Sequence, residues 1–229
     1  CLGDLMKLEA STADYLQQSV PGFDMEAPHY WANNMLADGI TAADLTVSEP
    51  ALIGWLHTLE AISQLCMASA RYRAAANYSR RVLKAEGYPT RAAGTVLLAL
   101  ARLEDQDGFF ALAHQLEEQI GADALENSPW YLLARTILLF KTNKMRPATR
   151  ALREFANRCE GGAFFLLNPM YQTPYLPCRP EPRDPWDLSH QAVWEADGII
   201  SDTPDFAPWA NACEDVSQLA QDFARRYGF

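Results

Sequence analysis

Apolar residues recur about every 3.6 positions along most of this chain, which is the period of an α-helix that buries one face. The first such stretch runs from Leu2 to Leu16, and Pro21-Gly22 ends it. A second helix is expected from Met25 to Leu36. Residues 1–47 therefore predict a pair of helices that forms either a degenerate first hairpin or a cap.

Residues 48–160 predict three further pairs of helices, each joined by a short turn. The first pair follows Ser48, a capping residue with an acid and a proline after it, and its second helix runs from Tyr72 to about Glu86. The second pair turns at Asp105-Gln106-Asp107-Gly108. The third pair begins at Ser128-Pro129 and turns at Asn143-Lys144. The central region is thus expected to consist of successive helical hairpins.

Residues 161–229 differ because six prolines lie between Asn168 and Trp186. Such a segment must be extended, since proline cannot continue a helix. Two helices are expected to finish the chain, over residues 187–199 and 204–227. The spacings of Pro174 with Pro177 and of Pro182 with Pro185 suit an SH3-type module, but the nearby tyrosines and leucines favour packing onto the helices. We therefore expect residues 1–47, 48–160 and 161–229 to form one continuous domain.

The second helices of the three central pairs share a large residue followed three positions later by a small one. These residues are Tyr72 and Ala75, Phe110 and Ala113, and Met145 and Ala148. The small residues are 38 and 35 positions apart, and tetratricopeptide repeats recur about every 34. Over residues 50–158 the chain therefore resembles tetratricopeptide repeat (TPR) proteins. It departs from their pattern at Ser63, Thr136 and Gly87, which replace a glycine and a proline of the repeat.

This resemblance implies an all-α fold, an α-α superhelix of TPR-like hairpins with a C-terminal helical cap, because such hairpins bury their apolar faces only by stacking. It also implies a non-catalytic scaffold that binds a protein or peptide in a concave groove lined by the first helix of each hairpin. The groove positions are His57, Glu60, Gln64, Arg102, Trp130, Leu133 and Ile137. The alternative interpretation places Leu133 and Ile137 in the core. The segment 168–177 also resembles the tail that follows the repeats in some bacterial proteins of this type.

A formal net charge of −10 disfavours nucleic acid, whose phosphates such a field repels. One local group of basic residues opposes this trend, and we interpret it as the solvated outer face of a helix. Its members are Arg71, Arg73, Arg80, Arg81, Lys84 and Arg91. No run of apolar residues is long enough to span a membrane, and no secretory leader is present, so a cytoplasmic protein is expected. The initial Cys1 leaves a mature bacterial lipoprotein as the alternative.

Five cysteines without a C-x-x-C pair predict no metal site and a reducing compartment, although a disulfide between Cys159 and Cys178 stays open. None of the four histidines has a second histidine one helical turn away, and His190 is expected on a helix surface. Neither a nucleophile elbow nor a phosphate-binding glycine loop occurs. The sequence therefore predicts no catalytic residue, no metal and no cofactor.

An acidic group near three tryptophans offers the competing function of a glycosidase-like hydrolase, which would use paired carboxylates. The acids are Glu195, Asp197, Asp202 and Asp205, and the tryptophans are Trp186, Trp194 and Trp209. Asp197-Gly198 and Asp202-Thr203-Pro204-Asp205 are also typical of a helix end and a helix cap. The structural interpretation is the favoured one.

Overall fold

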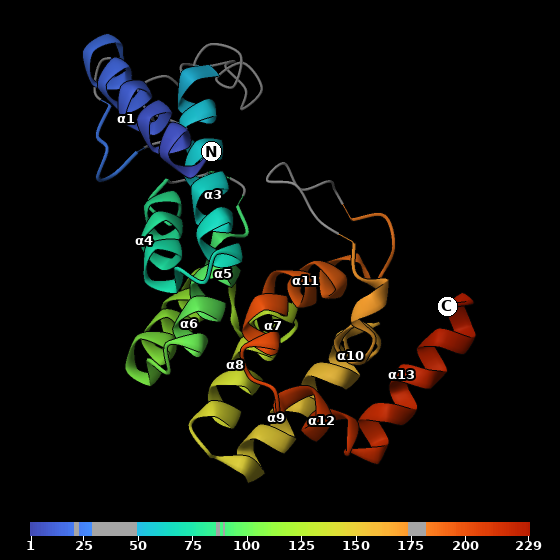
Figure 1. Cartoon of the computed structure of the whole chain (residues 1–229). Helices are drawn as coiled ribbons and strands as arrows, with labels where there is room; N and C mark the ends of the chain where they lie inside the picture. The colour runs from blue at the N-terminus through green and yellow to red at the C-terminus, as the bar shows by residue number, and fades with distance from the viewer. Residues whose placement is uncertain (21–22, 29–49, 86–87, 89, 174–181) are drawn as a thin grey trace. The chain divides into compact units, whose positions relative to one another are not determined.

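A computed structural model describes residues 1–20, 23–28, 50–85, 88, 90–173 and 182–229. All regular elements within these ranges are helices, so the expected all-α class is confirmed (Figure 1). The expected helix over Met25–Leu36, the cap at Ser48 and the Pro174-x-x-Pro177 spacing fall wholly or mostly outside the described residues. The helices are α1 Leu2–Ser19, α3 Pro50–Ala68, α4 Tyr72–Leu83, α5 Ala92–Arg102, α6 Gln106–Ile120, α7 Ala122–Glu126, α8 Pro129–Lys141, α9 Met145–Arg158, α10 Gly162–Leu167, the 3-10 turn η1 Pro169–Tyr171, α11 Asp187–Ser201, α12 Phe206–Asn211 and α13 Glu214–Tyr227.

The chain divides into two compact units, Cys1–Val96 and Leu97–Phe229, whose boundary lies within α5. Unit 1 contains α1, α3, α4 and the start of α5, and unit 2 contains the remaining helices. This division does not coincide with the expected segments 1–47, 48–160 and 161–229, which stay a prediction. Each unit has its own buried residues and is described by itself.

Three of the turns between helices have the same backbone geometry. Each contains a non-glycine residue with positive φ, namely Ala70 at 57°, Glu104 at 60° and Asn143 at 57°. In each turn this residue donates its N–H to the carbonyl three positions back, and the next residue donates to the carbonyl five positions back. The second of these bonds is characteristic of the Schellman motif that ends many helices. The chain therefore repeats one turn between α3 and α4, between α5 and α6, and between α8 and α9.

These turns correct the expected alignment of the second hairpin. Five residues after the positive-φ position lie Ala75, Phe109 and Ala148, and each is 0% exposed. Phe109 therefore occupies the position assigned to Ala113, whereas Phe110 is 44% exposed. The expectation was wrong by one helical turn, because Asp105 caps α6 by accepting from the Gly108 N–H and the helix begins earlier than expected.

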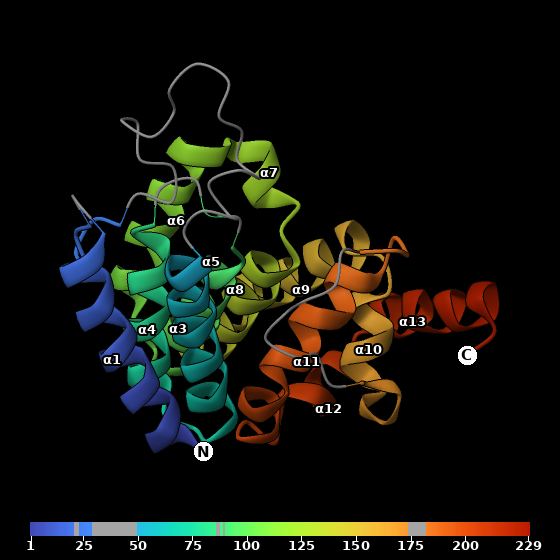
Figure 2. The ribbon, with the colours of Figure 1, turned by 90° about the horizontal axis from the view of Figure 1, so that it is seen from above.

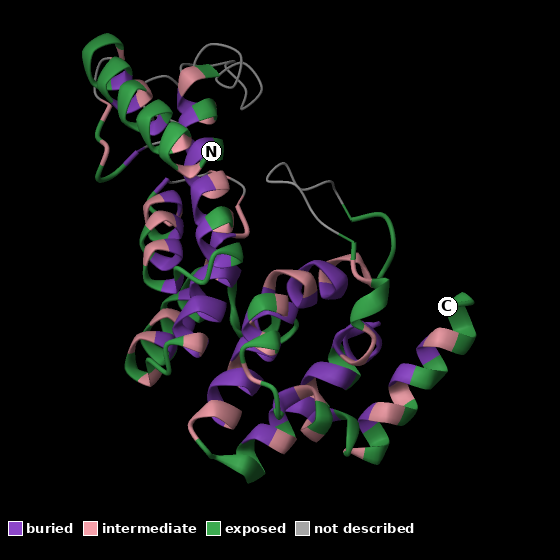
Figure 3. Cartoon of the chain, in the orientation of Figure 1, coloured by how far each residue is buried: buried purple, intermediate pink, exposed green. Residues whose placement is uncertain are grey.

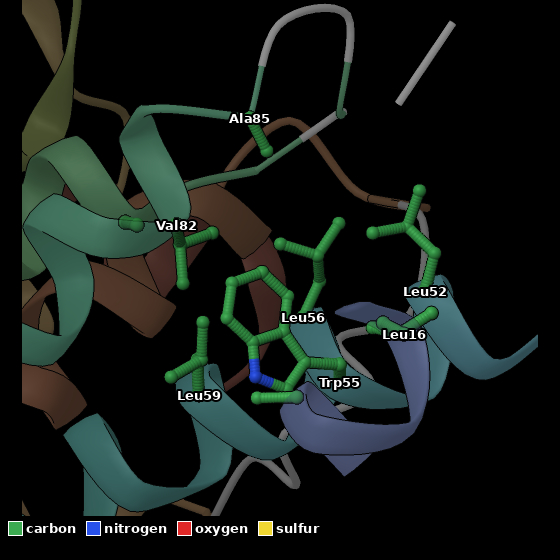
Figure 4. Close-up of a cluster of buried hydrophobic side chains, with 9 residues drawn as sticks. Leu16, Leu52, Trp55, Leu56, Leu59, Val82 and Ala85 are labelled. Atoms are coloured by element: carbon green, nitrogen blue, oxygen red, sulfur yellow. The ribbon is translucent and has the colours of Figure 1, made fainter. Parts of the chain in front are cut away.

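In unit 1, α3 packs against both α1 and α4, and these helices lie side by side in Figures 1 and 2. The amphipathic pattern of each helix places its apolar residues in one shared cluster (Figure 4). The buried members are Ala13, Leu16, Leu52, Trp55, Leu56, Leu59, Val82, Ala85 and Ala92. A pair of serines allows a close approach of α3 to α4, where the Ser63 and Ser79 hydroxyls are 2.7 Å apart.

One buried carboxylate completes the interior of unit 1. Glu9 of α1 is 8% exposed. Its Oε1 accepts hydrogen bonds from the Trp55 indole at 2.8 Å and from the Arg81 guanidinium at 2.6 Å. The guanidinium also lies 5.5 Å from the centre of the Trp55 ring. Glu9 is thus paired and hydrogen-bonded, as a buried charge must be.

In unit 2, the short helix α10 has the central position. It packs against α9, α11, α12 and α13, and its residues from Gly162 to Leu166 are buried. Gly162 is required there, because a Cβ atom would lie 2.7 Å from the Phe155 ring. Helices α8 and α9 form the neighbouring hairpin, and α11 packs against α8. Buried residues accordingly make up most of α8 and about half of α11 (Figure 3).

The end of the chain contains three helices where two were expected. Helix α11 confirms the first, but the expected helix over residues 204–227 is divided into α12 and α13. Cys213, in an extended conformation with φ −80° and ψ 99°, separates them. Glu214 and Asp215 in the first turn of α13 favour a new helix start at this point, since acids stabilise a helix N-terminus.

Candidate functional site

The three groove positions of unit 1 lie in one row on α3, because His57, Glu60 and Gln64 are spaced by three and four residues. His57 is exposed, and the other two are half-buried. Glu60 accepts hydrogen bonds from the Tyr88 hydroxyl at 3.1 Å and from the Thr90 hydroxyl at 2.5 Å. This row, which we call the α3 row, presents an imidazole, a carboxylate and an amide close together within one unit.

The groove positions of α8 are covered by contrast. Trp130, Leu133 and Ile137 are 5%, 0% and 1% exposed, and α11 packs against the helix that carries them. A ligand could touch Leu133 or Ile137 only if the elements that cover them moved away. Trp130, Leu133 and Ile137 are buried because α8 is apolar on most of its surface and is surrounded by other helices of the unit.

The structure brings Trp130 together with one of the acids of the alternative function. The Trp130 indole N–H donates to Oε2 of Glu195 in α11 at 2.7 Å. At the end of α5, the Arg102 guanidinium lies 3.5 Å from Oδ2 of Asp202. Two groups of residues that the sequence analysis kept apart, the groove positions and the acidic group, therefore meet within unit 2.

Through these contacts, two of the acids take part in the packing of helices. Glu195 and Asp202 connect α11 and its C-terminal end to α8 and α5, while Asp205 is the N-cap residue of α12. A glycosidase needs two carboxylates on either side of a sugar in one cleft. The two cavities at α10 are lined by other residues than these four acids.

His190 lies in a different place from the one expected. It is 4% exposed, and its ring lies 4.3 Å from the Phe165 ring. Nε2 accepts the backbone N–H of Thr173 at 3.2 Å, which requires this nitrogen to be unprotonated. Burial lowers the pKa of His190, and the nearby Asp187 carboxylate partly opposes this effect. Its expected position on a helix surface was wrong, because α10 and α8 both pack on α11 and widen its buried face.

Two cavities flank α10 in unit 2. The larger, about 420 Å³, lies between α9, α10 and α13, and Phe164, Leu219 and Phe223 form its apolar part. Of its charged residues, Arg226 contacts Glu160 at 3.0 Å, whereas Arg158 and Asp222 pair with residues outside the lining. The smaller, about 220 Å³, includes Asn168, Asn211 and Ser217. The sequence pattern did not indicate either cavity, because their walls come from helices distant in the sequence.

Two of the described cysteines, Cys66 and Cys159, are buried thiols. Burial raises the pKa of the Cys66 thiol, as it raises that of Cys159 to about 12, so both stay protonated near neutral pH. Cys66 packs in the interior as expected. The proposed pairing of Cys159 with Cys178 involves a residue outside the described ranges. Within those ranges, no three histidine, cysteine or acidic side chains are grouped as metal ligands.

Comparison with known proteins adds no family assignment: no model of a protein family, no curated protein and no solved structure matches this chain. A search of the described helices finds none with the length and apolar character needed to cross a membrane. The candidate site therefore rests on the geometry of the chain itself, and the α3 row is the part of the predicted groove that combines polar groups with an exposed side chain.

Proposed function

We propose that this protein is a non-catalytic scaffold of TPR-like helical hairpins that binds a segment of a partner protein. The recurrence of one interhelical turn at three places supports this proposal, because repeated hairpins are typical of proteins that bind extended peptides or helices. A cytoplasmic location remains part of the proposal.

The binding surface that we propose is the α3 row. His57, Glu60 and Gln64 offer hydrogen-bond donors and acceptors along about two turns of one helix, which suits an extended or helical segment. The corresponding row on α8 is covered by α11 of the same chain, so we do not include it. The exposed His57 is expected to contact the partner directly.

Affinity capture from native lysate with two matched variants tests the proposal. His57→Glu changes the α3 row, and His114→Glu makes the same substitution at an exposed position of α6. We expect His57→Glu to reduce recovery of at least one partner about tenfold, since an interfacial contact worth roughly 1.4 kcal/mol has that effect. The His114→Glu variant should recover the partner as the wild type does. Identical recovery by all three proteins would contradict the proposed surface.

A further inference from the structure

In this chain of 29 acidic and 19 basic residues, seven of the described arginines are paired with acids. Carboxylates lie within ion-pair distance of Arg81, Arg102, Arg135, Arg153, Arg158, Arg225 and Arg226. Helix α4 carries two arginines outside this paired set. Arg73 and Arg80 are exposed, and neither makes a hydrogen bond or ion pair with any residue that the structure describes.

The unpaired arginines lie on one face of α4. Arg73, Asn77 and Arg80 are spaced by four and three residues, so they form a row about 10 Å long on the solvent side of the helix. The opposite side, which includes Tyr72, Ala75, Ala76, Ser79 and Val82, is buried. No acid occurs between residues 71 and 85, so the row lacks a counter-charge on its own helix.

We propose that this α4 row is a second interaction surface, which binds an acidic segment of a partner protein. Guanidinium groups bind carboxylates through two parallel hydrogen bonds, and the Asn77 amide between them can donate a third. The excess of acids elsewhere on the chain makes the row a local exception to a negative surface. An acidic peptide can be short enough to contact the row without approaching the rest of that surface.

Other anionic partners fit the same face less well. A nucleic acid extends well beyond one helix and would meet the net charge of −10. The neighbouring tyrosines do not provide a stacking surface for bases, because Tyr72 is 7% exposed and Tyr78 lies beneath Arg81. A membrane surface would require an apolar face to insert, and that face of α4 is packed against α3.

Binding of a fluorescently labelled glutamate-rich peptide, measured by anisotropy at low salt, tests this proposal with the full chain. The α4 variant carries Arg73→Gln and Arg80→Gln. The control carries Arg146→Gln and Arg150→Gln, which remove equal charge from an exposed face of α9, where neither arginine is paired with a described residue. We expect the α4 variant to bind about threefold to tenfold more weakly, and the control to bind within about twofold of the wild type.

Three results would overturn the proposal. The wild type could fail to bind the peptide, both variants could weaken binding equally, or an oligonucleotide of the same charge could bind more tightly through the same arginines. Circular dichroism checks that the variants are folded. A second variant with Arg73→Lys and Arg80→Lys keeps the charge and should bind at an intermediate strength. The α4 row and the α3 row are tested by different probes, so either proposal can fail without the other.

Discussion

Buried polar contacts fix the helices of each unit at the scale of single residues. In unit 1, Glu9 connects α1 to Trp55 of α3 and to Arg81 of α4. In unit 2, Trp130 connects α8 to Glu195 of α11. Such contacts are specific because a buried donor or acceptor without a partner is costly. Each of them therefore defines how its helices are placed within the unit.

Glu9→Ala should destabilise the protein by about 2–4 kcal/mol, because it leaves the Trp55 N–H and the Arg81 charge without their acceptor inside the unit. Glu9→Gln should cost less, since its amide oxygen can still accept from Trp55. Urea unfolding, monitored by circular dichroism, measures the free energy of unfolding of both variants. Equal stability of the two variants would show that the accepted hydrogen bond does not contribute.

His190 should make the stability of the protein depend on pH. Its pKa in the folded protein is below the ordinary value of 6.5, so below that pH the unfolded chain binds a proton more readily than the folded one. The free energy of unfolding should therefore decrease as the pH falls through 6.5, by at most about 1.4 kcal/mol per pH unit. This decrease should end once the pH is below the pKa of His190 in the folded protein.

Urea unfolding at pH 7.5 and 5.5 (chosen at about one unit on either side of the ordinary pKa) checks this expectation. His190→Gln should lose part of the pH dependence, because glutamine does not titrate. His114→Gln is the matched control, since this histidine is 72% exposed. If both variants keep the pH dependence of the wild type, His190 is not the group responsible.

At the scale of elements, the shared turn is the main organising feature of the chain. Ala70, Glu104 and Asn143 all have positive φ, which ordinary residues adopt at an energetic cost and glycine adopts readily. The turn is the same despite three different residues, so the backbone hydrogen bonds around it determine the conformation. It joins each helix pair through three residues.

Replacing Ala70 by glycine should stabilise the protein by about 0.5–1 kcal/mol, because glycine removes the strain of the left-handed conformation. Ala70→Val should destabilise it, since a β-branched side chain is least compatible with positive φ. Thermal unfolding of the two variants compares these effects. A destabilising Ala70→Gly substitution together with a harmless Ala70→Val would contradict the assigned turn.

The sequence predicted elements best where a local signal marks their ends. Ser128 was identified as the cap of α8, and its hydroxyl accepts from the Tyr131 N–H. The sequence predicted less where the burial of a residue depends on packing between helices. A small residue at Ala113 suggested the wrong register, because the position of α6 that corresponds to Ala75 and Ala148 contains the large Phe109. The burial of His190 comes from contacts with two other helices, which no local pattern encodes.

At the scale of the whole molecule, the fold class could be predicted from periodicity alone, whereas the site could not. The all-α architecture is confirmed, but the groove positions divide between two units. The positions on α3 form a row in which His57 is exposed and Glu60 and Gln64 are half-buried, and Leu133 and Ile137 on α8 are core residues. Which face of a helix is covered depends on residues far away in the chain, here those of α11.

Site-specific photo-crosslinking tests the proposed scaffold function most directly. A photoreactive amino acid is placed at His57 in the α3 row or at the exposed His114 of α6, and the full chain is irradiated in native lysate. The proposal predicts a covalent adduct with a partner protein from position 57 and none from position 114. Adducts of the same proteins from both positions, or from neither, would contradict partner binding through the first helix of the hairpin.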